Sequence, residues 1–159
     1  MIRMLKENDL IRPMIPADIE AVMRIENATN PTPWSEKIML DCLNVGFKCF
    51  SLVVDGAVMG YAIYVLSLYQ CHLLNLRLDP ALQGKGYGSD FLRFCLKETL
   101  KAGVGWMVLE VRPSNPAGIA LYTKFGFTQI AVKEKYYDDG DGRFEDALIY
   151  GLWIKEDKL

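Results

Sequence analysis

The chain has 159 residues, which suffices for one domain that buries about two-thirds of its unfolded surface. It carries 18 Lys and Arg against 20 Asp and Glu, so its net charge of -2 offers no long-range attraction for DNA. The sequence opens without the apolar run of a signal peptide, and no segment approaches the ~18 apolar residues that cross a membrane. We therefore expect a cytoplasmic protein with a single domain over residues 1–159 and no membrane or DNA partner.

Two helices come first in the predicted order of elements. Apolar residues at helical spacing follow Pro16 and predict a helix over 18–29. A second helix is predicted over 35–43, with Ser35 as its N-cap.

Three strands follow these helices. Runs of apolar, β-branched and aromatic residues predict strands over 47–55 and 57–68. The dipeptide Asp55-Gly56 between them favours the positive dihedral angles of a tight turn, so we expect an antiparallel hairpin. A third strand is predicted over 72–79, and Pro80, which cannot donate to a strand ladder, helps to end it.

The next part of the chain alternates between helix and strand. An apolar stripe closed by a glycine predicts a helix over 88–103, and a short buried strand follows over 106–112. Another helix is predicted to begin at Pro116, with Asn115 as its N-cap. Gly126, followed by an apolar residue, is predicted to end it.

The last two strands are predicted over 127–137 and 144–154, linked by a polar stretch. The chain has no internal repeat or linker, and its hydrophobic period changes from one element to the next. This order predicts an α/β (α+β) fold, with a mixed, mostly antiparallel twisted sheet of about seven strands flanked by about four helices.

Cysteine and histidine usage argues against metal chemistry. The four cysteines form no C-x-x-C pair and lie among apolar residues, so we predict reduced core residues at Cys42, Cys49, Cys71 and Cys95. His72 is the only histidine, which excludes histidine-based metal sites and Ser-His-Asp catalysis. We interpret His72 as an ordinary polar residue at the start of a strand, and we predict no metal cofactor.

Three glycines, Gly84, Gly86 and Gly88, lie between the strand at 72–79 and the helix that follows it. A glycine-rich turn before a helix favours anion binding, because backbone N–H groups and the positive end of the helix dipole converge there. The pattern is not a Walker A loop, since Lys85 lies between two glycines, and G-x-G-x-G is not the dinucleotide fingerprint. A phosphate-binding loop and a plain glycine-rich connector both stay open.

A second group of polar residues surrounds the helix that starts at Pro116. Asn115 and Tyr122 are seven residues apart, so they share one helix face. Glu110 lies among apolar neighbours in the preceding strand. It is either ion-paired with Arg112, two positions further on, or a base with a raised pKa.

These motifs and their order resemble the GNAT family of acetyl-CoA-dependent N-acetyltransferases. Residues 83–88, QGKGYG, fit that family's pyrophosphate loop, Q/R-x-x-G-x-G/A. From about residue 10 to 152 the chain is similar to the bacterial RimI group, the ribosomal-protein alanine N-acetyltransferases. The stretches that carry this narrower match are PWSEK at 33–37, NLRLDP at 75–80, LEVRPSNPAGIALYTKFGF at 109–127 and YYDDGDGRFEDALI at 136–149. The chain departs from that group at Arg77, where a small apolar residue is usual, and by an insertion at Phe144.

The resemblance implies a role for each residue of the site. The backbone of β-strand residues 76–78 would pair with the pantetheine arm of acetyl-CoA, and the loop would wrap the pyrophosphate. Glu110 would accept a proton and Tyr122 would donate one. The implied cofactor-binding residues are Leu76, Arg77, Leu78, Gln83, Gly84, Lys85, Gly86, Tyr87, Gly88, Ser89 and Asn115.

Three aromatic residues are candidates for substrate binding. Trp34 is either part of the substrate mouth or a hydrophobic staple before the N-cap Ser35. Tyr136 and Tyr137 either line a peptide cleft or pack as ordinary strand residues. The acidic residues that follow either receive a basic peptide or form a solvated hairpin tip. They are Asp138, Asp139, Asp141, Glu145 and Asp146, opposed by Arg143.

The resemblance implies acetyl transfer to a protein N-terminus, in particular an N-terminal alanine of a small-subunit ribosomal protein. A free α-amine has a pKa near 7.7–8.0 against about 10.4 for lysine, so a carboxylate acting through water deprotonates it more easily. Two alternatives stay open: a GNAT enzyme acting on lysine side chains or small amines, and a CoA-binding module without catalysis. The sequence predicts no oligomeric state.

Overall fold

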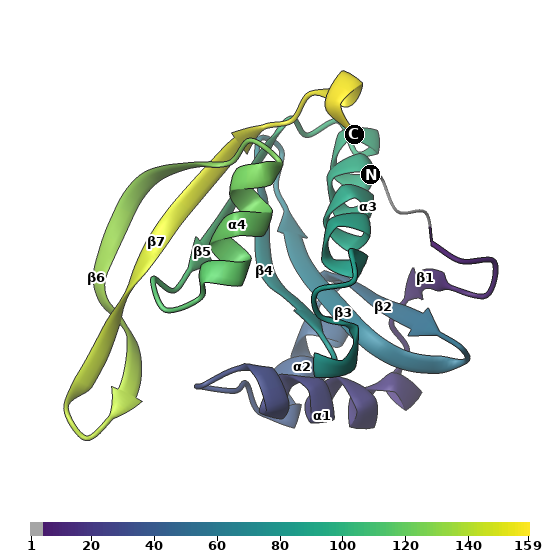
Figure 1. The fold of residues 1–159 in the computed structure, drawn as a ribbon, viewed down its shortest axis with the longest axis horizontal. Helices are drawn as coiled ribbons and strands as arrows, with labels where there is room; N and C mark the ends of the chain where they lie inside the picture. Colours follow the sequence, from purple (N-terminus) through teal and green to yellow (C-terminus); the bar gives the residue numbers. More distant parts are fainter. Residues whose placement is uncertain (1–4) are drawn as a thin grey trace. The chain divides into compact units, whose positions relative to one another are not determined.

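The computed structural model describes residues 5–159, which form a seven-stranded sheet and four α-helices (Figure 1). Residues 1–4, part of the opening stretch considered for a signal peptide, lie outside the described residues. The elements are β1 (Leu10–Pro13), η1 (Pro16–Asp18), α1 (Ile19–Thr29), α2 (Glu36–Asn44), β2 (Lys48–Val54), β3 (Ala57–Leu66), β4 (Cys71–Leu78), η2 (Pro80–Leu82), α3 (Tyr87–Lys101), β5 (Trp106–Val111), α4 (Pro116–Lys124), β6 (Thr128–Gly140), β7 (Arg143–Trp153) and η3 (Glu156–Lys158).

The strand order is β1-β2-β3-β4-β5-β7-β6. β4 and β5 pair in parallel over Cys71–Leu73 and Met107–Leu109. The pairs β1–β2, β2–β3, β5–β7 and β6–β7 are antiparallel. The predicted mixed and mostly antiparallel sheet is confirmed.

The chain divides into two compact units. The first takes in the described residues up to Val65 together with Leu74–Cys95, and the second comprises Leu66–Leu73 and Leu96–Leu159. β4 and α3 each continue from one unit into the other. That one domain spans residues 1–159 stays a prediction.

The core of the first unit forms where α1 and α2 pack on β2 and β3. Val22, Ile25 and Met39 from the helices are fully buried with Tyr61 and Ile63 from β3. They share the helix faces that the apolar spacing of the sequence indicated. The predicted N-cap of α2 is confirmed, because the Ser35 side chain accepts a hydrogen bond from the backbone N–H of residue 38.

A partly buried ion pair fixes the start of α1. Arg12 donates two hydrogen bonds to the Asp18 carboxylate, at 2.7 and 2.9 Å. The same carboxylate accepts from the backbone N–H of Ile15 and from the Ser51 hydroxyl. Arg12 belongs to β1, a strand that the sequence did not reveal, because four residues ending in Pro13 carry too little periodicity to be recognised.

The second unit contains the long β6–β7 ribbon, which extends past the end of β5 (Figure 1). The polar stretch expected to link the two strands lies largely within them, since β6 runs to Gly140 and β7 starts at Arg143. Asp141 and Gly142, with φ of 54° and 72°, make the turn. An Asp-Gly pair in this conformation closes a two-residue hairpin. Both predicted strands therefore stopped short of the turn.

All four cysteines are free and buried, as predicted. Burial raises the pKa of Cys49 to about 12 and that of Cys71 to about 11. Within residues 5–159 no group of three or more His, Cys, Asp or Glu side chains is arranged to hold a metal ion. In the same range no helix combines the length and apolarity needed to cross a membrane.

Candidate active site

The glycine loop of the first unit has the conformation that its glycines allow. Asp79 caps the short helix η2 by accepting from the N–H of Ala81, and the chain then turns into the loop. Gly84 and Gly86 have φ of 75° and 89°, a region that side chains with a Cβ rarely adopt. The fifteen-residue helix α3 begins directly afterwards at Tyr87, one residue earlier than predicted. The loop therefore joins a strand to a helix N-terminus, the arrangement that binds anions.

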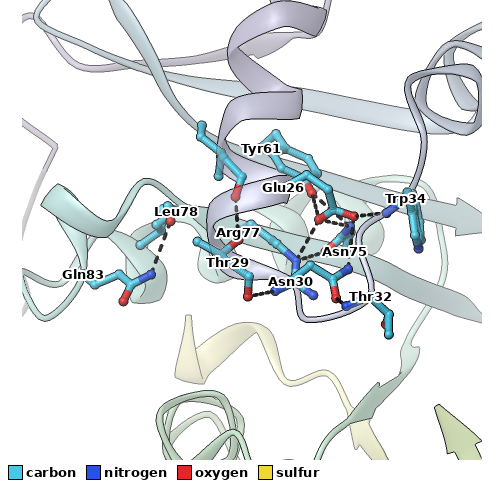
Figure 2. Close-up of polar contacts among 11 residues, drawn as sticks. Glu26, Thr29, Asn30, Thr32, Trp34, Tyr61, Asn75, Arg77, Leu78 and Gln83 are labelled. Carbon is cyan, nitrogen blue, oxygen red and sulfur yellow. Dashed lines mark hydrogen bonds and ion pairs between the residues drawn. The ribbon is translucent and has the colours of Figure 1, made fainter. Parts of the chain in front are cut away.

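Residues 76–78 of β4 precede this loop and are partly exposed. The β3 backbone passes close beneath them at Gly60, where a Cβ would lie 3.0 Å from the Arg77 carbonyl oxygen. Gln83 points its side-chain amide at the Leu78 carbonyl oxygen, 3.4 Å away (Figure 2). Tyr87 is buried, so its side chain anchors the loop from the core side.

Glu110 lies in β5 of the second unit, next to the start of β4 in the parallel ladder. His72 Nε2 lies 2.6 Å from Glu110 Oε2, and Lys133 Nζ lies 3.7 Å from Oε1. The Glu110 side chain is only 14% exposed, whereas that of His72 is 33% exposed. Because an ionised carboxylate only accepts hydrogen bonds, the imidazole donates its Nε2–H to Glu110.

These neighbours lower the pKa of Glu110. Burial by itself raises it, but the hydrogen bond and charge of His72, with the charge of Lys133, outweigh the burial. The interpretation of Glu110 as a base with a raised pKa is wrong, because its pKa is lowered. Glu110 is ion-paired, as the other interpretation held, but its partners are His72 and Lys133 and not Arg112. Strand spacing alone cannot show that β4 and β5 are neighbours, so the role of His72 was missed. The only signal in the sequence was a single histidine in the apolar run of a predicted strand.

Arg112 instead ties the β5–α4 loop to the β6–β7 hairpin. Its NH1 lies 3.0 Å from an Asp139 carboxylate oxygen and 2.9 Å from Glu145 Oε1. Its guanidinium carbon lies 4.0 Å from the centroid of the Tyr137 ring, a cation–π contact. Glu145 also accepts from the backbone N–H and hydroxyl of Ser114. The motifs LEVRPSN and YYDDGDGRFED, which are far apart in sequence, thus meet in one ion-pair cluster.

This cluster neutralises part of the acidic charge on the hairpin. Asp139 and Glu145 are paired with Arg112 and are not available as free charges. Asp146 accepts from the backbone N–H of residue 135. Asp141 at the tip is 92% exposed beside Arg143. The hairpin has an exposed acidic tip and an internally neutralised base.

Asn115 and Tyr122 belong to α4. The Asn115 side chain caps the helix by accepting from the N–H of Gly118 at 3.0 Å, which confirms the predicted N-cap. A Cβ at Gly118 would lie 2.5 Å from the Asn115 amide nitrogen, so a side chain there would displace the Asn115 cap. Tyr122 is half-buried and its ring packs edge-on against Phe127, with 5.6 Å between centroids.

The candidate substrate-binding aromatics occupy different settings. Trp34 packs against the core of the first unit, and its backbone N–H donates to Glu26 at 2.9 Å. Tyr136 is exposed and stacks edge-on against Tyr137 in the second unit. The β6–β7 register shifts between Lys133 and Tyr137, and Lys135 has a φ of 51°. This bulge re-aims the tyrosine pair relative to a regular strand.

Residues 19–127 match the acetyltransferase (GNAT) family. The chain belongs to this family. It is 37% identical over 137 residues to the [ribosomal protein bS18]-alanine N-acetyltransferase of Escherichia coli K12, covering 86% of this chain and 92% of that protein.

Solved structures agree with this assignment. The crystal structure of the ribosomal-protein-S18-alanine N-acetyltransferase from E. coli matches with a TM-score of 0.84 and 34% identity, over 92% of this chain and 94% of that one. The structure of yncA from Salmonella typhimurium with its cofactor acetyl-CoA matches with a TM-score of 0.77 and 26% identity, over 94% and 96%. The chain is thus an N-acetyltransferase, which sets aside a CoA-binding module without catalysis.

Proposed function

We propose that this enzyme transfers an acetyl group from acetyl-CoA to the N-terminal α-amine of a protein, an N-terminal alanine of a small-subunit ribosomal protein in particular. The similarity to the E. coli bS18-alanine enzyme, in sequence and in fold over most of both chains, carries this proposal. The low pKa of Glu110 also supports an α-amine substrate. A carboxylate of this kind is a weak base, and an α-amine holds its proton less tightly than lysine does.

The glycine loop and β4 would bind the cofactor. The backbone of residues 76–78 would pair with the pantetheine arm, and Gln83–Ser89 would hold the pyrophosphate through N–H groups at the start of α3. Asn115 would add a further contact. The exposed β4 segment and the glycine conformations fit these roles. Bound acetyl-CoA supplies the acetyl group as a thioester.

Two residues would move protons during transfer. Glu110, held ionised by His72 and Lys133, would accept the proton of the attacking amine through water. A C–N bond forms and the C–S bond breaks, and the Tyr122 hydroxyl would protonate the departing sulfur. His72 would hold the carboxylate in one orientation and leave Oε1 to face the water. Trp34, Tyr136 and Tyr137 would contact the peptide.

Thiol release with three peptides tests the reaction. One copies the alanine N-terminus of the ribosomal protein, one has that amine blocked and an internal lysine free, and one has both amines blocked. We expect turnover only with the free N-terminus. Turnover with the lysine peptide alone would overturn the proposal and support the lysine-directed alternative.

Two variants test the assigned roles. Glu110→Gln and Tyr122→Phe should each lower kcat by about a hundredfold or more while acetyl-CoA binding changes little. Lys124→Met, a nearby change on α4, serves as a control. Equal losses in turnover and in cofactor binding would contradict the proton-transfer roles.

A further inference from the structure

Glu26 is a charged residue in α1 with no solvent exposure. Its Oε1 accepts a 2.6 Å hydrogen bond from the Tyr61 hydroxyl and lies 3.1 Å from Arg77 Nε (Figure 2). Burial, followed by the neighbouring Glu26, raises the pKa of Tyr61, so its hydroxyl stays protonated and donates. Asn75 bonds both of these residues: its side-chain amide donates to the Tyr61 hydroxyl and accepts from Arg77 Nε at 2.8 Å.

The second carboxylate oxygen of Glu26 holds the segment between α1 and α2. Oε2 accepts from the backbone N–H of Trp34 at 2.9 Å and from the Asn30 side chain at 3.1 Å. Asn30 in turn accepts from the N–H of Thr32. Residues 30–35, NPTPWS, contain two prolines and no regular structure in their centre. Their path is therefore set by these side-chain contacts.

Arg77 connects the same segment to β4. Its side chain bonds Glu26 and also donates from NH1 to the carbonyl oxygen of Thr29, the last residue of α1, at 3.0 Å. Figure 2 shows Arg77 between Thr29 and Glu26. The backbone of Arg77 lies in the strand segment 76–78, to which the proposed function assigns the pantetheine arm. One residue thus contacts both the cofactor strand and the anchor of residues 30–35.

A purely structural explanation of this cluster is weak. Burying a carboxylate and a guanidinium costs several kcal/mol per ion in general, and well-packed apolar residues stabilise a core at least as well. Charged hydrogen bonds instead fix direction and distance, because they are shorter and geometrically more specific than neutral ones. Here the acceptor Glu26 belongs to α1 and its donors come from β3, β4 and the 30–35 segment, so the cluster determines the relative positions of these parts.

We propose that Glu26 and Arg77 are positioning residues that couple the cofactor strand β4 to residues 30–35, and that residues 30–35 position the acceptor peptide. This inference rests on the proposed function, which places Trp34 at the peptide. Acetyl-CoA lying along residues 76–78 restrains the Arg77 backbone. Through Glu26 the restraint reaches the Trp34 N–H, so the segment becomes ordered for the second substrate.

Kinetics of three variants test this inference. Arg77→Ala removes the guanidinium and leaves Glu26 bonded to Tyr61, Asn30 and Trp34. We expect its KM for the free-amine peptide to rise about tenfold, the loss typical of one charge-assisted contact, with the KM for acetyl-CoA within about twofold of wild type. Arg77→Lys, which keeps the charge, should recover part of the loss. Arg24→Ala, a change at an exposed residue of α1, should match wild type.

Hydrogen exchange provides a readout that needs no turnover. In the wild type, acetyl-CoA should slow exchange of the amides of residues 30–35, that of Trp34 above all. In Arg77→Ala this slowing should disappear at a temperature where both proteins are fully folded, although the melting temperature falls because the buried Glu26 loses its cationic partner. Glu26→Gln, which turns an acceptor toward the Trp34 N–H into a donor in one orientation, should speed exchange of this segment even without cofactor.

The outcomes separate this inference from the proposed function. Failure of the wild type to acetylate any free N-terminus would overturn the proposed function, yet the cofactor-dependent exchange would still report the coupling. If the peptide KM and the exchange of residues 30–35 in Arg77→Ala match those of Arg24→Ala, the coupling is wrong. A parallel fall of kcat, both affinities and melting temperature would show a merely structural role and would also overturn it.

Discussion

At the residue scale, the environment of Glu110 sets what this carboxylate can do. A half-buried glutamate without partners would hold its proton more tightly than one in water. His72 and Lys133 reverse that tendency and lower the pKa of Glu110, so the carboxylate is ionised near neutral pH, as its proposed role requires. One of its oxygens, Oε2, is bonded to His72, and the other, Oε1, lies 3.7 Å from Lys133 Nζ.

Removing His72 should therefore change the pH dependence of the reaction. In His72→Leu the hydrogen bond and the electrostatic interaction of His72 with Glu110 are lost, so the pKa of Glu110 rises and the carboxylate becomes protonated at higher pH. We expect the acid limb of the kcat/KM profile to move to higher pH, with kcat at neutral pH lowered about tenfold because the carboxylate is no longer held in place. Profiles that extend from below pH 4 to pH 9 for wild type and variant measure both effects. An unmoved acid limb would mean that Glu110 is not the base.

Asn115 combines a helix cap with a proposed cofactor contact, and substitution can separate the two. Ser also caps helices, so Asn115→Ser should keep the stability of α4, whereas Asn115→Ala should lower the free energy of unfolding by about 1 kcal/mol. If the amide also contacts acetyl-CoA, both variants raise the KM for acetyl-CoA. Urea unfolding and steady-state kinetics measure the two roles. If the KM for acetyl-CoA in both variants equals that of the wild type, Asn115 is a helix cap and does not contact the cofactor.

At the scale of elements, Arg112 and Glu145 join the β5–α4 loop to the β6–β7 hairpin. Loss of Glu145 leaves Arg112, whose side chain is only 8% exposed, with Asp139 alone, and loss of Arg112 leaves both carboxylates without their cation. We expect Arg112→Met and Glu145→Gln each to lower the free energy of unfolding by about 2–4 kcal/mol. The double variant should be less harmful than the sum, with a coupling of about 1–3 kcal/mol measured by urea unfolding. Strict additivity would mean that the two side chains do not act as a pair.

The elements also show how far the sequence could predict this structure. Helix starts at Ser35 and Asn115 were predicted because a capping side chain is a local signal, and the structure contains both hydrogen bonds. The Asp55-Gly56 hairpin was equally local, and its residues have the expected positive φ. The partner of Glu110 was not predictable, because it depends on the β4–β5 register. The Glu26 cluster was missed for the same reason, since its members come from three elements.

At the scale of the whole chain, the buried thiols offer a test of the folded state. Burial raises the pKa of Cys49 and Cys71, and the thiolate is the reactive form. We expect a disulfide reagent at pH 8 to react with the native protein slowly, at the rate of its opening, and to react with all four thiols immediately in denaturant. Fast reaction of the native protein would contradict the buried positions of the cysteines.

The pH dependence of the protein's stability follows from carboxylates whose pKa is lower in the folded protein than in the unfolded chain. Hydrogen bonds from Arg12 lower the pKa of Asp18, and in Glu145 the bonds from Arg112 and Ser114 outweigh the opposing effect of burial. The pKa of Glu110 is lowered as well. A group whose pKa is lower in the folded than in the unfolded chain binds fewer protons when folded. Its contribution is therefore complete above the unfolded value, about 4, and is lost as the pH falls through the folded value.

We therefore expect the free energy of unfolding to be nearly constant from neutral pH down to about pH 5 and to fall steadily below it. Asp18→Asn should lower the stability at neutral pH by about 2–4 kcal/mol, because Arg12 loses its charged partner. The same variant should lose less on acidification than the wild type, since the group that titrates is gone. Urea unfolding between pH 3 and 7 measures both slopes. Parallel curves for wild type and variant would mean that the Arg12–Asp18 pair contributes nothing to the acid sensitivity, and that Glu110 and Glu145 account for it.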